Sequence, residues 1–268
     1  MAGENRLEFE EHMFKEVAAD YSFRGTPLGN TTTDPELNGQ IDLQNISKAY
    51  AEFYDRFFHT ENMWMVVGDV KSHDMTAYTL EEVIESSGFN RPPITSRAKA
   101  SRDPPLSEFK PGPIIYEKEQ DENSPPSIDL YLTWQAVPWN DNDAYVFYVL
   151  EWLFGSASDF MEGGPGRGMH SRAPSLIHRL EIAEIDTVFK LFKKTGIFGL
   201  HYKVSPEDAP KAVVEMIYQM AILTESITEE ELSRAKNSQA LKVAMNMERQ
   251  MERSVELSYN VFVGPTLH

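Results

Sequence analysis

Six prolines between residues 90 and 113 constrain the fold of this chain more than any other feature. They are Pro92, Pro93, Pro104, Pro105, Pro111 and Pro113. Proline has no backbone N–H to give to a helix or a sheet, and its fixed φ breaks a helix interior. The stretch therefore cannot hold regular structure and indicates a linker. It predicts two domains, residues 1–90 and 114–268, joined by residues 91–113.

The residues before the linker alternate helices with one short strand. A helical pattern over residues 7–20 is followed by a turn over residues 24–30, where glycine and proline break the helix. Apolar residues at i, i+3, i+4 spacing predict an amphipathic helix over residues 42–58. Residues 63–70 are short and apolar, as a buried strand is, and residues 72–85 predict another helix. This half is an α/β layer whose sheet needs more strands than it contains.

The residues after the linker predict an α+β domain. Expected are strands at 114–118, 128–135, 186–193 and 196–204, and helices at 142–154, after Ser205-Pro206, and at 229–256. Thr228 and Glu231 make a capping box at the start of the last helix. Runs of strands followed by helices place the helices on one face of a mainly antiparallel sheet. The two domains are expected to be related, with the first one incomplete.

Composition narrows the possible functions. The chain has no cysteine, which excludes disulfides, thiolate zinc sites and thiol nucleophiles. Its 25 Lys and Arg against 42 Asp and Glu give a formal charge of −17, which disfavours nucleic acids and anionic membranes and favours basic ligands. The acidic charge has a second interpretation, namely that it only keeps the protein in solution. No apolar stretch approaches the roughly 18 to 20 residues of a membrane span.

A glycine-rich loop over residues 155–168 is the most specific motif. Four glycines and a proline in six positions leave few side chains to block a ligand and many N–H groups to offer it. The loop lacks the Gly-Lys-Ser/Thr ending of a phosphate-binding loop. It is either a ligand-binding loop over a cleft or an ordinary surface loop. The candidate substrate-binding residues are Gly163, Gly164, Pro165, Gly166, Arg167, Gly168 and Met169.

Several segments resemble the pitrilysin/insulinase-type metallopeptidase family. GGPGRGMHSR, residues 163–172, resembles the glycine-rich loop of the α-type subunits of mitochondrial processing peptidases, and residues 195–201 resemble the strand after that loop. EEELSRAKN, residues 229–237, resembles the family's "EELxRAKN" helix. GTPLG at 25–29 and the strand before Asp69 resemble segments of its first domain. The resemblance covers nearly the whole chain.

The resemblance implies a non-catalytic subunit in which the glycine-rich loop holds a basic presequence for a zinc-bearing β subunit to cut. It implies a place on the matrix side of the mitochondrial inner membrane, and kinship with core subunit 2 of respiratory complex III, the cytochrome bc1 complex. The partners would be a β-type subunit (core subunit 1), cytochrome-bearing complex III subunits and basic peptides. A purely structural core subunit without a processing role is the alternative. A zinc-independent peptide-binding protein in another compartment is a third.

No catalytic residue, metal ligand or cofactor is expected. Zinc peptidases of the family use HxxEH, and the nearest string, EFEEHM at residues 8–13, has glutamate in place of the first histidine and indicates a solvated helix face. His170-Ser171 is not expected to act as a hydrolase dyad, because adjacent residues seldom provide the geometry. The remaining histidines show no ligand spacing with one another or with a carboxylate: His59, His73, His178, His201 and His268. The targeting segment is expected to have been removed or to lie outside this sequence.

Overall fold

The chain forms two compact units in the computed structural model. The structure describes residues 15–30, 43–58, 65–67, 71–86, 106–115, 126–158, 171–180 and 182–263. Unit 1 consists of Met1–Thr32 with Leu106–Met245, and unit 2 consists of Thr33–Pro105 with Asn246–His268. The domain boundaries expected at residues 90 and 113 stay a prediction.

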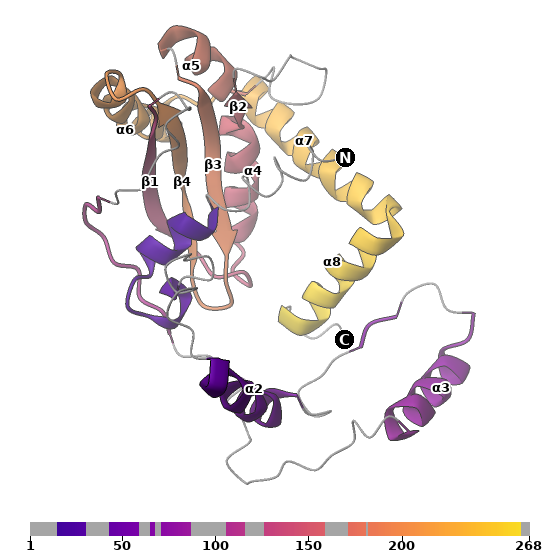
Figure 1. Cartoon of the computed structure of the whole chain (residues 1–268). Helices are drawn as coiled ribbons and strands as arrows, with labels where there is room; N and C mark the ends of the chain where they lie inside the picture. The colour runs from indigo at the N-terminus through magenta and orange to yellow at the C-terminus, as the bar shows by residue number, and fades with distance from the viewer. Residues whose placement is uncertain are drawn as a thin grey trace. The chain divides into compact units, whose positions relative to one another are not determined.

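A four-stranded antiparallel sheet lies at the centre of unit 1 (Figure 1). Its strands are β1 (Ile128–Ala136), β2 (Ala157–Ser158), β3 (Glu184–Leu191) and β4 (Gly196–Val204), in the order β1-β4-β3-β2. The predicted hairpin joins β3 to β4, and Thr195 accepts a hydrogen bond of 2.8 Å from the backbone N–H of Phe192 in its turn. β1 pairs with β4 along its whole length. This sheet confirms the predicted α+β class.

Helices cover one face of the sheet. They are α4 (Ala144–Phe154), α5 (Ala173–Leu180), α6 (Ala209–Glu225) and α7 (Glu229–Glu248). Alternate side chains of β3 and β4 meet the helices in one apolar core, which includes Phe154, Leu176, Ile185, Leu200, Tyr202, Val204 and Met216. Trp152 of α4 donates a hydrogen bond of 2.7 Å to Gln239, which fixes α7 against α4. Burial of this face is the main source of stability for unit 1.

The opposite face of the sheet carries residues from near the N-terminus, an arrangement that the sequence did not predict. A helix over residues 15–22, drawn in indigo in Figure 1, lies against this face. The apolar core between this segment and the sheet consists of Ala18, Ala19, Phe23, Val188 and Ile197. The Lys190 ammonium on β3 also pairs with Glu16. Both faces of the sheet are therefore covered by described residues.

The end of the predicted linker packs on the same segment. The backbone N–H of Lys110 donates to Ser22 O at 2.9 Å, and Arg24 donates to Lys110 O at 2.6 Å. The side chain of Ser107 accepts a hydrogen bond of 3.3 Å from the N–H of Leu28. Residues 107–111 are irregular, as predicted, yet they are held in place by these contacts.

In unit 2 the described residues are mainly helical. They form α2 (Leu43–Phe57), α3 (His73–Ser86) and α8 (Gln250–Val263), so the helices predicted at 42–58 and 72–85 are confirmed. The expected buried strand at 63–70 is wrong where it is described. Residues 65–67 are irregular, and Met65 is 59% exposed. A strand needs a partner for its backbone groups, and the described part of unit 2 contains no other strand.

Two further expectations differ from the structure. Residues 114–115 of the strand expected at 114–118 are irregular, and the rest lie outside the described residues. The helix expected at 229–256 is divided into α7 and α8 around Arg249, although no glycine or proline marks the break. None of the described helices is both long and apolar enough to cross a membrane.

Candidate functional site

The candidate substrate-binding residues 163–169 lie outside the described residues, as do His170 and the string at 8–13. The structure does describe both ends of the glycine-rich loop. The chain leaves α4 through Gly155 and β2, and it returns at Ser171 to start α5. β2 pairs with β3, with Ala157 opposite Ile185. The loop therefore departs from a strand of the sheet and comes back to a helix of the covering layer.

The two ends of the loop meet at Gly155. This glycine has φ of +76°, a conformation that side chains disfavour, and a Cβ built on it would lie 2.2 Å from Ser171 Oγ. Its carbonyl oxygen accepts a hydrogen bond of 2.8 Å from the Thr187 hydroxyl on β3. The backbone N–H of Arg172 donates to Leu153 O at 3.4 Å. Glycine is favoured here because φ is positive and because the Ser171 side chain lies directly against its Cα.

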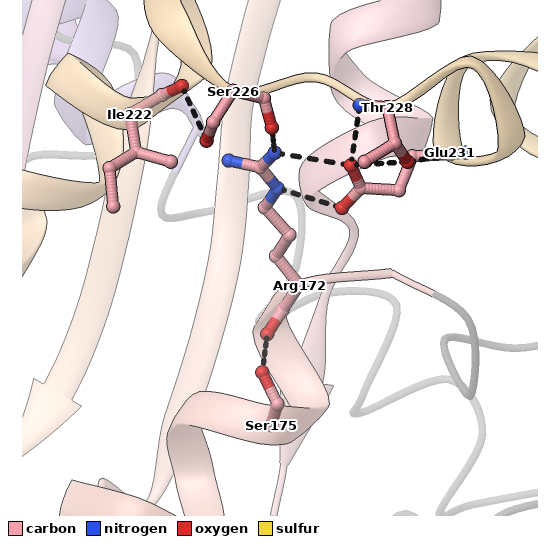
Figure 2. A network of polar contacts seen from close by, with 6 residues as sticks. All are labelled: Arg172, Ser175, Ile222, Ser226, Thr228 and Glu231. Atoms are coloured by element: carbon pink, nitrogen blue, oxygen red, sulfur yellow. Dashed lines mark hydrogen bonds and ion pairs between the residues drawn. The ribbon is translucent and has the colours of Figure 1, made fainter.

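The base of the glycine-rich loop is the place where Leu153 and Gly155 meet Ser171 and Arg172. Arg172 connects this loop base to the turn between α6 and α7 (Figure 2). Its Nε lies 3.2 Å from Glu231 Oε1, and its Nη2 lies 3.4 Å from Glu231 Oε2 and 2.8 Å from Ser226 O. The Arg172 side chain is only 12% exposed and that of Glu231 24%. An arginine that binds one carboxylate through two nitrogens is held in orientation as well as in place. Residues far apart in sequence are thereby joined at one point.

Glu231 serves two roles at this point. The predicted capping box is confirmed, since Thr228 N–H donates to Glu231 Oε2 at 3.0 Å and Glu231 N–H donates to Thr228 Oγ1 at 3.2 Å. The hydrogen bond from the Thr228 backbone lowers the pKa of the Glu231 carboxyl, burial acts against this, and Arg172 lowers it further. Glu231 is thus held as a carboxylate that caps α7 and neutralises Arg172.

The described residues at the loop base hold the two ends of the loop, and none of them is placed as a reactive group. Ser171 packs against Gly155, and the ring of His170 is outside the described residues, so the expectation about a dyad stays a prediction. Among the described residues no group of three or more His, Asp or Glu side chains is placed to hold a metal ion. A loop of glycines with fixed ends can offer backbone N–H and C=O groups to an extended peptide. The described contacts hold the two ends of the loop in place.

A second polar cluster lies on the opposite face of the sheet, around His201. Its Nε2 lies 2.8 Å from Asp129 Oδ1 on β1, and its Nδ1 lies 3.9 Å from Asp186 Oδ2 on β3. The ring of Tyr131 stacks on the imidazole, with 4.7 Å between the ring centres. The His201 side chain is 4% exposed. A histidine on the middle strand therefore links three neighbouring strands.

The charge around His201 sets its protonation. Burial acts against the imidazolium, but the hydrogen bond to Asp129 and the charge of Asp186 outweigh burial and raise the pKa of His201. Burial also raises the pKa of the Tyr131 phenol, and burial together with Asp186 raises the pKa of Glu184. No sequence pattern indicates this cluster, because its members lie on three different strands and not along one element.

The cluster predicts a pH dependence of stability. Because the pKa of His201 is higher in the folded chain than in the unfolded chain, its stabilising effect is complete below about pH 6.5 and is lost as pH rises through the folded pKa. The Glu184 carboxyl also has a raised pKa, so its stabilising effect is also lost as pH rises. That loss begins at a lower pH, near the unfolded pKa of about 4.3. We expect His201→Gln to flatten the fall in the free energy of unfolding above about pH 6.5, measured by urea titration. An unchanged slope in the variant would show that His201 is not the titrating group.

The sequence matches a known family over most of its length. Residues 48–239 match the family described as Peptidase M16 inactive domain. The chain is 23% identical over 262 residues to a "Probable mitochondrial-processing peptidase subunit alpha" of Schizosaccharomyces pombe, an alignment that covers 93% of this chain and 50% of that protein. It is 32% identical over 124 residues to a "Probable mitochondrial-processing peptidase subunit alpha-2, chloroplastic/mitochondrial" of Arabidopsis thaliana, over 45% of this chain and 25% of that protein.

A solved structure shares the fold. A chain of "Complex III2 from Candida albicans, Inz-5 bound" superposes with a TM-score of 0.69 at 15% sequence identity, over 94% of this chain and 57% of that chain. This likeness concerns the fold alone. The present chain spans about half the length of the relatives that align with nearly all of it.

Proposed function

Because the chain belongs to the Peptidase M16 inactive domain family, we propose that it is a non-catalytic α-type subunit of a mitochondrial processing peptidase. In this proposal the glycine-rich loop, residues 163–169, binds basic presequence peptides. A β-type subunit with an intact HxxEH motif supplies the zinc and cuts the bound peptide. The protein then acts on the matrix side of the mitochondrial inner membrane.

One observation carries the proposal: the alignment with an α subunit of a mitochondrial-processing peptidase covers 93% of this chain. The described loop base supports it, because Gly155 and Arg172 hold the two ends of the loop at fixed places on the helix layer. Such a base lets the loop bind a peptide without a large ordering cost at its ends.

Charge supports a basic ligand. The formal charge of −17 attracts Arg- and Lys-containing peptides, and the attraction is stronger in an enclosed site than at an open surface. Binding of such a peptide should weaken as salt rises, since exposed charges are screened over about 8 to 10 Å near physiological ionic strength. A ligand held only by apolar contacts would lack this salt dependence.

The loop itself provides the test of presequence binding. We expect Gly164→Val with Gly166→Val to raise the Kd for a basic presequence peptide by about tenfold, equivalent to about 1.4 kcal/mol, because β-branched side chains stiffen and fill the loop. Fluorescence anisotropy with a labelled presequence peptide measures the change, and an unchanged melting temperature shows that the variant is folded.

A graded control accompanies the double variant. Gly164→Ala with Gly166→Ala restricts the backbone but adds less volume, so it should fall between the wild type and the valine variant. Equal affinity in all three proteins would exclude a role of these glycines in peptide binding.

A second function is favoured by the structural likeness. The chain shares its fold with a chain of a complex III structure, and in this alternative it is a matrix-side core subunit of the cytochrome bc1 complex that contributes contacts only. Purification of the native assembly distinguishes the two. Cytochrome-bearing subunits would co-purify in the alternative, and the loop variants would leave presequence processing unchanged. A subunit that belongs to both assemblies would show the cytochromes and the loop effect together.

The domain organisation is part of the proposal. We infer a first peptidase-like domain that ends near residue 90, a linker over residues 91–113 and a second peptidase-like domain from residue 114. The sheet and helices of β1 to α7 support the second domain. Residues 15–30 pack on the sheet of this second part and belong to the same compact unit.

A further inference from the structure

We propose that Arg172 is a positioning residue for peptide binding: through Glu231 it fixes the returning end of the glycine-rich loop to the turn between α6 and α7. The inference rests on the proposed function, because it concerns how the same loop is made ready for a peptide. Arg172 itself is not assigned a contact with the peptide.

The geometry supports this role. Arg172 is the second described residue after the loop, and its backbone N–H bonds to Leu153 at the other end of the loop. Its guanidinium makes three contacts of 2.8 to 3.4 Å with Ser226 and Glu231. Figure 2 shows the side chain extended from the start of α5 to the residues that precede and begin α7. Through its backbone N–H and its side chain, Arg172 therefore ties both ends of the loop to a third part of the helix layer.

The ion pair also removes a repulsion between Arg172 and a basic peptide. A cation at the base of the loop would repel a basic peptide, but Glu231 lies against the guanidinium and cancels its charge. Because Arg172 is 12% exposed, removing either partner leaves a poorly solvated charge. Arg172→Gln leaves the carboxylate, which attracts a basic peptide. Glu231→Gln leaves the guanidinium, which repels it.

Because the two variants leave opposite charges, their effects on peptide affinity distinguish a positioning role from a purely electrostatic one. If Arg172 positions the loop, both single variants should weaken binding by about tenfold at high salt, where charge effects are screened. If the pair acts only through its charge, the two variants should differ in direction at low salt and both approach the wild type at high salt.

The experiment uses the full chain and a labelled basic presequence peptide in fluorescence anisotropy, at low and at high salt. Hydrogen exchange of residues 153–158 and 226–231 is measured on the same proteins and should rise in both single variants. Arg249→Gln is the matched control, because it removes an arginine from an exposed pair with Glu252 on α8. Its affinity and exchange at these segments should equal those of the wild type.

The outcomes distinguish this inference from the proposed function. A wild-type chain that binds no presequence peptide at low salt would overturn the proposed function. A wild-type chain that binds, with Arg172→Gln and Glu231→Gln of equal affinity to it at high salt, would overturn the positioning role. Weakened binding in both variants at high salt, with faster exchange at both segments, is the result that we expect.

Discussion

Replacing Phe154 by alanine should lower the free energy of unfolding by about 3 to 5 kcal/mol, the usual cost of removing a buried aromatic ring. Phe154 is the last residue of α4 and is completely buried in the core between the sheet and the helices. The next residue is Gly155, where the loop begins. The substitution removes the packing beneath the loop base, so it should affect stability and loop position together. Chemical denaturation followed by far-UV circular dichroism measures the loss.

Tyr145 provides the control for this prediction. It lies on the same helix, is also aromatic and is 75% exposed. Tyr145→Ala should change the free energy of unfolding by no more than about 0.5 kcal/mol, as is usual at exposed positions. Similar losses for both variants would contradict the burial of the α4 end that the account requires.

Phe23→Ala is expected to cost a comparable amount, about 3 to 5 kcal/mol, although its position in the sequence is far from the sheet. The ring is fully buried and meets the edges or faces of Phe109 and Phe192 at centre distances of 6.1 and 5.7 Å. It packs with Val188 and Ile197 on the sheet face opposite the helices. Its removal leaves a cavity between the N-terminal segment, the segment around Phe109 and the sheet, and it removes two edge-to-face ring contacts.

The measurement combines urea denaturation with hydrogen exchange of residues 15–30. Faster exchange in this segment shows that the lost stability comes from its contact with the sheet. Tyr218→Ala on α6 is the control, since that ring is 53% exposed and its removal should cost no more than about 0.5 kcal/mol. A Phe23 variant as stable as the wild type would mean that the N-terminal segment does not pack on the sheet.

Sequence patterns predicted most of the helices and the strands β1, β3 and β4 of the central sheet, but not β2 or α5. The hairpin of β3 and β4 followed from two apolar runs separated by Thr195-Gly196. The capping box of Thr228 and Glu231 followed from residue spacing alone. The family resemblance is confirmed by the match over residues 48–239. Local patterns were sufficient here because each of these features depends on residues close together in the sequence.

The contacts that pattern could not predict are long-range. Phe23 lies between the predicted helix over residues 7–20 and the predicted turn over residues 24–30, and nothing in its neighbourhood indicates that it packs on strands about 165 or more residues later. Arg172 belongs to the motif over residues 163–172, but its pairing with Glu231 depends on how α5 and α7 pack. His201 and its two carboxylates share no spacing because they lie on three different strands. The strand expected at 63–70 was wrong where described, because an apolar run needs a partner strand as well as the right composition.

If the chain is the α-type subunit proposed above, it assists cleavage of presequences without cleaving them. The most direct measurement mixes the purified chain with a zinc-loaded β-type subunit and follows cleavage of a presequence peptide by mass spectrometry. We expect no cleavage by the chain alone, little by the β-type subunit alone and rapid cleavage by the mixture. Cleavage by the chain alone, or a mixture no faster than the β-type subunit by itself, would contradict the account.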